Sequence, residues 1–338
     1  MPTFNATNSS FNRSEAWVVT GSGTTLGTNR VGSYVSGVFT GTSISASVNA
    51  DNTRVVASQV DDNPHVVQIL ASGANTVTIG TGLATGTHKF KFFYNGRGAT
   101  PGNRFDGPDV TLNSITCDAL SASLSKAPKR LYMFGDSIFA LYQAVSHVDS
   151  ISLSITEGLR PIWDVSSFAI GGTGWVNIGG GSMPIIGTHW NTAWTGTAYT
   201  FPAPDAVYIC MGTNDGGQTD TAVQNNAVST LNAMLTRWPS AKILLMTPWG
   251  GTKRSAVIAA HGTVNSPRVI LIDNGTEYNR GITPGANDYY SNDDVHPNLQ
   301  ALPGIIARMG YDLGVYTAPV GSSVGAGTIN AVGTFSYV

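Results

Sequence analysis

The hydrophobic pattern of the chain changes near residue 125, and this change limits the possible folds more than any other feature. Before it, short alternating or apolar runs are separated by clusters of Gly, Asn and Asp. Recurrent short strands at roughly 8–12-residue spacing are typical of a β-sandwich or a jelly roll. The runs that predict strands cover residues 16–20, 33–39, 43–48, 54–60, 65–70, 76–79, 88–94 and 109–117. The sequence therefore predicts an all-β domain over residues 1–125.

After a small, polar linker at residues 121–129, apolar runs alternate with stretches of helical periodicity. Strands are predicted at 130–134, 164–170, 205–211, 242–246 and 268–272, and helices at 138–147, 220–237, 254–261 and 301–313. Strands that alternate with helices indicate an α/β fold, with a parallel sheet covered on both faces. We therefore divide the chain into an accessory β-sandwich or jelly-roll domain (1–125), an α/β domain (126–315) and a Gly/Ser/Thr-rich C-terminal tail (316–338). The tail either forms a strand pair that returns to the first domain or has no regular structure.

The composition of the chain argues against two classes of partner, nucleic acids and membranes. Charged residues make up 11% of the sequence and the formal net charge is −2, with no run of Lys or Arg, so a basic stripe that binds nucleic acid is not expected. No apolar stretch approaches the roughly 20 residues of a membrane helix, so no membrane partner is expected either. The first residues lack the basic and apolar regions of a signal peptide. The neutral polar composition favours an extracellular or virion-associated protein, and it leaves the oligomeric state open.

Four segments that follow predicted strands carry polar groups of a kind used in catalysis. They are Gly135-Asp136-Ser137, Gly171-Gly172-Thr173-Gly174, Gly212-Thr213-Asn214-Asp215 and, beyond the fifth strand, Asp293-Asp294-Val295-His296. Each segment alone has a simpler interpretation: a helix cap, a flexible turn, an Asx-turn, and a surface ion pair or calcium loop. Ligands of parallel sheets bind beyond the carboxyl ends of the strands. Because all four segments follow strands in this way, together they favour one site for acyl transfer.

The side chains in these segments have the properties that acyl transfer needs. A hydroxyl at a strand-to-helix junction, as expected for Ser137, has its own backbone N–H directed toward an oxyanion formed by its attack. A glycine such as Gly172 lets the backbone approach a substrate and offers a second N–H, and Asn214 offers a neutral third donor. Asp293 and His296 are close enough in sequence for one loop to deliver both, with the imidazole toward the serine and the carboxylate fixing the ring.

The four segments, in this order, resemble the motif blocks of the SGNH (GDSL-type) hydrolase family over about residues 130–312. The resemblance implies a flavodoxin-like three-layer α/β/α domain that hydrolyses ester bonds without a metal or an organic cofactor. It implies that Ser137 is the nucleophile, His296 the base and Asp293 the partner that orients the base. The implied oxyanion hole consists of the N–H of Ser137, the N–H of Gly172 and the side chain of Asn214.

The chain departs from this family pattern in small ways. Ile138 replaces the leucine of the Gly-Asp-Ser-Leu form, a change that conserves volume. Gly171 and Gly172 are adjacent, and we favour Gly172 as the second donor. Asp215 is expected to support its loop rather than to take part in the chemistry.

The order of the two predicted domains resembles that of carbohydrate esterase family two and related two-domain acetyl esterases. This resemblance implies the removal of acetyl groups from a polysaccharide or an oligosaccharide. Trp175, Trp190 and Trp249 follow predicted strands and are candidates for contact with a sugar, although packing under long loops is the simpler interpretation of each. Two alternatives remain: a lipid or aryl esterase on the same scaffold, and a phage or cell-surface glycan-binding protein with a secondary hydrolase site.

Overall fold

The computed structural model describes most of both predicted domains. The described residues are 1–96, 107–121, 124, 126–140, 158–159, 162–178, 192–194, 197–198, 201–248, 251–273, 309–310 and 312–313. Asp293, His296, Trp190 and Trp249 lie outside these residues, as do the tail at 316–338 and most of the helix predicted at 301–313.

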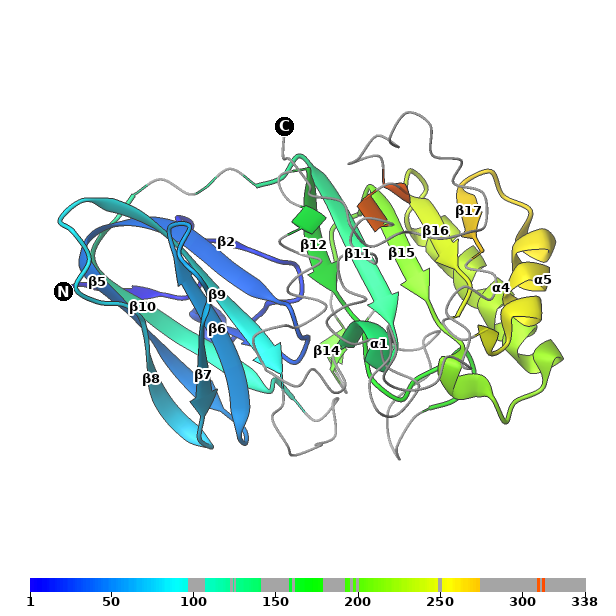
Figure 1. The fold of residues 1–338 in the computed structure, drawn as a ribbon, viewed down its shortest axis with the longest axis horizontal. Helices are drawn as coiled ribbons and strands as arrows, with labels where there is room; N and C mark the ends of the chain where they lie inside the picture. Colours follow the sequence, from blue (N-terminus) through cyan, green and yellow to red (C-terminus); the bar gives the residue numbers. More distant parts are fainter. Residues whose placement is uncertain are drawn as a thin grey trace, which may run out of the picture.

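The N-terminal domain is a β-sandwich of ten strands that pair antiparallel in one hydrogen-bonded network (Figure 1, blue to cyan). The strands are β1 (Thr3–Asn5), β2 (Asn12–Arg13), β3 (Val18–Thr20), β4 (Thr25–Thr28), β5 (Tyr34–Ala50), β6 (Arg54–Val60), β7 (Val66–Leu70), β8 (Gly73–Gly80), β9 (Thr87–Gly96) and β10 (Val110–Leu120). A short 3₁₀ turn, η1 (Gly21–Gly23), joins β3 to β4. Trp17, Phe39 and Phe90 are among the buried residues of its apolar core. The predicted all-β fold is confirmed.

The long strand β5 joins two segments that the sequence predicts as separate strands. Its first half pairs with β9 and its second half with β8, while β10 pairs along both halves. The change of partner occurs at Gly41, whose φ is 137°. A Cβ atom there would lie 2.5 Å from Asp118 Oδ2. Only glycine therefore fits this point, where the strand continues but its partner changes.

The second domain contains a five-stranded sheet in which every pair of strands is parallel. Its strands are β11 (Lys129–Gly135), β12 (Trp163–Ser167), β15 (Ala206–Cys210), β16 (Lys242–Met246) and β17 (Val269–Ile272). They lie in the order β12-β11-β15-β16-β17, which is the 2-1-3-4-5 order of flavodoxin-like folds. A separate hairpin pairs β13 (Thr192–Trp194) with β14 (Thr197–Ala198).

Helices cover both faces of the parallel sheet (Figure 1). On one face, α4 (Asp220–Arg237) and α5 (Arg254–Val264) pack against strand residues such as Tyr132 and Phe134. On the other face, Ile138 of α1 (Ser137–Ala140) and Met309 pack against residues such as Leu131. The predicted three-layer α/β/α arrangement is therefore confirmed. Among the described residues, no helix is both long enough and apolar enough to cross a lipid bilayer.

Buried polar contacts join the edge strand β12 to the N-terminal domain. The hydroxyl of Tyr34 donates to the carboxylate of Asp164, and both side chains are buried. The amide of Glu15 donates to Ser166 Oγ at 2.9 Å. Lys126, in the linker, lies 3.5 Å from the carboxylate of Asp164 and 3.7 Å from that of Glu15. The N-terminal domain is thus fixed against the sheet by groups that have lost most of their contact with water.

Candidate active site

Three of the four predicted segments meet at the carboxyl edge of the parallel sheet. Strand β11 lies between β12 and β15, so the turn that contains Ser137 has the two neighbouring loops on either side. The loop after β12 carries Gly172, and the loop after β15 carries Asn214. The sheet order therefore brings together residues that are 35 or more positions apart in the sequence.

Ser137 is the first residue of α1 and directly follows the turn that ends β11. Only 8% of its surface is exposed. The turn is fixed by Asp136, whose Oδ1 accepts the amide of Ile138 at 2.9 Å. The hydroxyl predicted to be the nucleophile thus stands at a strand-to-helix junction with restricted access to solvent, the position that the oxyanion argument requires.

The backbone geometry distinguishes the two adjacent glycines after β12. Gly172 has a φ of 79°, a left-handed conformation that L side chains rarely adopt, whereas Gly171 is not among the residues with positive φ. The carbonyl of Gly172 accepts Asn177 Nδ2 at 3.0 Å. The amide of Gly172, by contrast, donates to none of the described residues. This geometry supports Gly172 as the second oxyanion donor.

Asn214 connects the loop after β15 to the glycine loop. It lies in η2 (Thr213–Asp215), and its Nδ2 donates to the carbonyl of Thr173 at 2.9 Å. Thr173 is itself held, because its Oγ1 donates to the carbonyl of Ile170 at 2.7 Å. The carbonyl of Thr173 uses one of the two N–H bonds of the amide and fixes which way the amide faces. Within the described part of the chain, no group accepts the second N–H of Asn214.

Asp215 holds the glycine loop through three backbone amides. Its carboxylate is fully buried and accepts the N–H of Trp175 at 2.7 Å, of Val176 at 3.1 Å and of Asn177 at 2.8 Å. A Cβ atom at Gly174 would lie 2.4 Å from Asp215 Oδ1, so the glycine lets the loop wrap around the carboxylate. Asp215 does support a loop, as predicted, but its carboxylate holds the neighbouring loop that carries Gly172 rather than its own.

Trp175 does not face a substrate. Its side chain is fully buried in the core beneath α4 and α5, and its indole Nε1 donates to the carbonyl of Met211 at 3.0 Å. An indole whose N–H is bonded and whose ring is enclosed has neither a polar nor an apolar face to offer to a sugar. The expectation that Trp175 binds substrate is wrong, and the alternative of core packing holds.

Sequence analysis did not assign a role to Asp136, whose electrostatic state is unusual. Burial raises the pKa of Asp136 to about 7, opposed by the Ile138 amide and by the nearby Thr213 hydroxyl, and the charge of Asp215 raises it further. Among the described residues, neither Asp136 Oδ2 nor Thr213 Oγ1 has a hydrogen-bond partner of normal geometry. The acid next to the predicted nucleophile therefore gains or loses a proton near neutral pH. The only feature of the sequence that indicates the burial of Asp136 is its position just after the apolar run Leu131–Phe134.

Of the predicted catalytic triad, only Ser137 belongs to the described residues. Asp293 and His296 stay predictions, as do Trp190 and Trp249. Gly172 and Asn214, the predicted oxyanion donors, lie on neighbouring loops that Asp215 and Thr173 tie together.

Comparison with solved structures defines the class of the fold. No protein-family model matches the sequence, and no curated protein matches it. A family two carbohydrate esterase from Cellvibrio japonicus superposes with a TM-score of 0.75 at 17% identity, covering 92% of this chain and 96% of that one. One from Clostridium thermocellum, in complex with cellohexaose, has a TM-score of 0.75 at 19% identity over 90% and 99%. An acetyl xylan esterase from the rumen bacterium Butyrivibrio proteoclasticus has a TM-score of 0.74 at 14% identity over 94% and 100%.

The sheet order and the three loops define a two-domain protein whose second domain has the SGNH hydrolase fold. More particularly, the chain has the fold of the family two carbohydrate esterases over about nine-tenths of its length. At 14–19% identity these likenesses establish the arrangement of both domains.

Proposed function

We propose that this protein is a serine esterase that removes acetyl groups from a polysaccharide or an oligosaccharide. One observation carries the proposal: Ser137 begins a helix at the carboxyl edge of the sheet, between loops that hold Gly172 and Asn214. A hydroxyl next to fixed, neutral N–H donors is the arrangement that acyl transfer needs. The likeness of the fold to carbohydrate esterases supports an ester of a carbohydrate as the substrate.

The proposed reaction has two steps. Ser137 Oγ attacks the ester carbonyl while His296 takes its proton, and Asp293 holds the other side of the imidazole. The N–H groups of Ser137 and Gly172 and the amide of Asn214 bind the oxyanion. The protonated His296 returns its proton to the alcohol that leaves, and a water molecule then releases the acyl group from Ser137 by the same route. No step needs a metal ion or an organic cofactor.

The proposed base sets the pH dependence of the reaction. His296 must be neutral to accept the proton of Ser137, so activity should fall as the pH drops through roughly 6–7, where an unperturbed histidine becomes charged. Trp190 and Trp249 are proposed to contact the sugar rings, since an indole has both an apolar face and a polar N–H. We further propose that the protein acts outside the cell or on a virion, in keeping with its low content of charged residues, 11%.

The test of this function is an acetate-release screen over acetylated xylan, mannan, chitin fragments and bacterial glycans. The wild-type protein should release acetate from at least one of them, and Ser137→Ala should lower the rate on the order of 10⁴–10⁶-fold. Ser229→Ala, an exposed serine on α4, is the matched control and should keep full activity. Release of acetate at similar rates by Ser137→Ala, or from no glycan by the wild type, would overturn the proposal.

A second assay separates the proposed acetyl esterase from a lipid or aryl esterase on the same scaffold. Chromogenic esters with an acetyl group and with longer acyl chains are compared at equal concentration. A preference for acetyl supports the proposal. A preference for long chains identifies a lipid esterase instead.

A further inference from the structure

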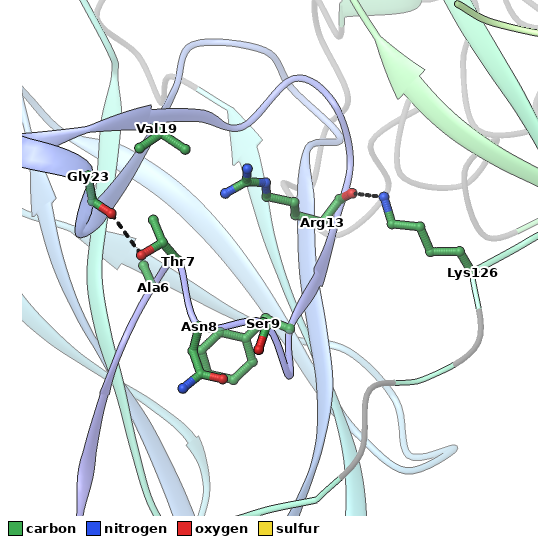
Figure 2. Close-up of a pocket in the computed structure, with 9 residues that line it drawn as sticks. Ala6, Thr7, Asn8, Ser9, Arg13, Val19, Gly23 and Lys126 are labelled. Carbon is green, nitrogen blue, oxygen red and sulfur yellow. Dashed lines mark hydrogen bonds between the residues drawn. The ribbon is translucent and has the colours of Figure 1, made fainter. Parts of the chain in front are cut away.

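A pocket lies in the N-terminal domain beside the linker, and none of the described residues that line it belongs to the candidate active site (Figure 2). Its volume is about 450 Å³, within the roughly 300–1,000 Å³ range of small-molecule sites. The residues that line it are Ala6, Thr7, Asn8, Ser9, Phe11, Arg13, Val19, Gly23 and Lys126. Among the described residues, the lining includes two cationic side chains and several neutral polar groups, but no carboxylate.

Arg13 brings to this pocket a positive charge that no described carboxylate pairs with. Figure 2 shows its guanidinium pointing into the space that Thr7, Asn8 and Val19 also border. Among the described residues, no carboxylate or carbonyl pairs with that guanidinium. The other cation, Lys126, is already engaged: its Nζ donates to the carbonyl of Arg13 at 2.8 Å and lies 3.5 Å from the carboxylate of Asp164. Lys126 therefore fixes the backbone of Arg13 and leaves the guanidinium for a ligand.

The remaining polar groups of the pocket are donors or are held in place. Asn8 Oδ1 accepts the amide of Ser10 at 2.9 Å, which leaves the amino group of Asn8 as its free end. Thr7 Oγ1 donates to the carbonyl of Gly23 at 2.9 Å and closes one side of the pocket (Figure 2). Ser9 is exposed and adds a hydroxyl. A guanidinium, an amino group and a hydroxyl together suit a ligand that is rich in oxygen and carries a negative charge.

The apolar residues of the pocket indicate which class of oxygen-rich anion would fit it. Val19 is 42% exposed, which is high for a valine, and Phe11 adds an aromatic lining. An apolar surface next to oxygen-binding groups fits a sugar ring, whose C–H and hydroxyl groups lie on different faces. A single guanidinium matches the planar, singly charged carboxylate better than a phosphate, which usually attracts several cationic groups.

We propose that this pocket binds a uronic acid residue of a polysaccharide, with the carboxylate of the sugar on the guanidinium of Arg13. The pocket is a second glycan site, on the accessory domain. It goes beyond the proposed esterase activity and does not depend on it, because none of the described residues that line it takes part in the proposed acyl transfer. Loss of activity and loss of this binding are therefore separate outcomes.

The test is calorimetric titration of the full chain with non-acetylated oligogalacturonate and glucuronate oligosaccharides at low ionic strength. Neutral cello- and xylo-oligosaccharides of equal length, and inorganic phosphate, are the comparison ligands. An acidic oligosaccharide should bind best, and Arg13→Gln should weaken that binding about 10-fold or more, as expected for a charge-assisted hydrogen bond. Lys89→Gln removes a positive charge from an exposed side chain of the same domain and should leave binding unchanged, as should Ser137→Ala.

A second variant tests the pocket with Arg13 in place. Asn8→Asp puts a negative charge beside the proposed carboxylate and should abolish binding of the acidic oligosaccharide, while thermal unfolding confirms that each variant is folded. Unchanged binding by folded Arg13→Gln or Asn8→Asp would overturn the proposal. It would also be overturned if neutral oligosaccharides or phosphate bound as tightly as the acidic oligosaccharide.

Discussion

Replacing Asp215 by asparagine tests whether one buried carboxylate organises the candidate oxyanion hole. The carboxylate accepts three backbone amides at 2.7–3.1 Å and is fully buried. Asparagine has nearly the same shape but has one acceptor oxygen and no charge, so an amino group must face at least one of these amides. A buried donor left unpaired costs about 1–3 kcal/mol, and the remaining bonds lose the extra strength that the charge gives them. The expected loss in the free energy of unfolding is about 2–5 kcal/mol.

Urea denaturation at pH 8 measures this loss, and steady-state kinetics on an acetyl ester measures its effect on the site. Because the loop that carries Gly172 is held by fewer and weaker hydrogen bonds, kcat should fall by at least about 10-fold while KM changes little. Asp220→Asn is the matched control. Asp220 pairs with Lys253 at 2.8 Å but its side chain is 62% exposed, so its loss should cost less than about 1 kcal/mol. If Asp215→Asn is no more destabilising than Asp220→Asn, the proposed supporting role is refuted.

Three further substitutions test other parts of the account. Asn214→Ala should lower kcat on the order of 10²–10³-fold with little change in KM, whereas a rise in KM alone would make Asn214 a substrate-binding residue. Burial raises the pKa of Asp136 from 3.8 to about 7. Between these two values the folded protein keeps a proton that the unfolded chain releases. The free energy of unfolding of the wild type therefore falls as the pH rises from about 4 to about 7. Asp136→Asn should therefore gain urea resistance relative to wild type across that interval, and a difference that is constant with pH would contradict the pKa shift. Tyr34→Phe removes a donor from the buried carboxylate of Asp164 and should cost about 1–3 kcal/mol in urea denaturation; a loss below about 0.5 kcal/mol would show that this contact does not hold the domains together.

Regular elements with strong local signals could be predicted from the sequence. Helix α4 spans Asp220–Arg237 as predicted, because Thr219 caps it by accepting the amide of Ala222 and its apolar residues recur at helical spacing. The continuity of β5 could not be predicted, because the sequence around Gly41 predicts a turn between two separate strands. Whether a glycine ends a strand or bends it depends on the strands beside it, which the local sequence does not specify.

The strands that sequence analysis missed are short. Strands β1, β2 and β4 contain two to four residues, too few for an alternating pattern to be recognised. Each of them is held by a partner far along the chain: Thr3 pairs with Thr116, for example. Their existence is a consequence of the folded sheet rather than of their own propensities.

The candidate site was predictable where its residues follow strands. The positions of Ser137, Gly172 and Asn214 follow from the rule that loops at the carboxyl ends of parallel strands gather at one edge. The burial of Trp175 and of Asp136 does not follow from that rule, because it depends on which neighbouring loop packs over each side chain. An aromatic or acidic residue after a strand can face either the solvent or the core, and the sequence alone does not distinguish the two.

The most direct test of the central claim is labelling of the native protein with a fluorophosphonate, which reacts with activated serine hydroxyls, followed by mass spectrometry of its peptides. We predict a single adduct on Ser137, lost in unfolded protein, formed far more slowly by His296→Ala and formed normally by Ser229→Ala. An unlabelled Ser137, an adduct on another serine, or an equal rate in His296→Ala would contradict the claim that Ser137 is a nucleophile activated by His296.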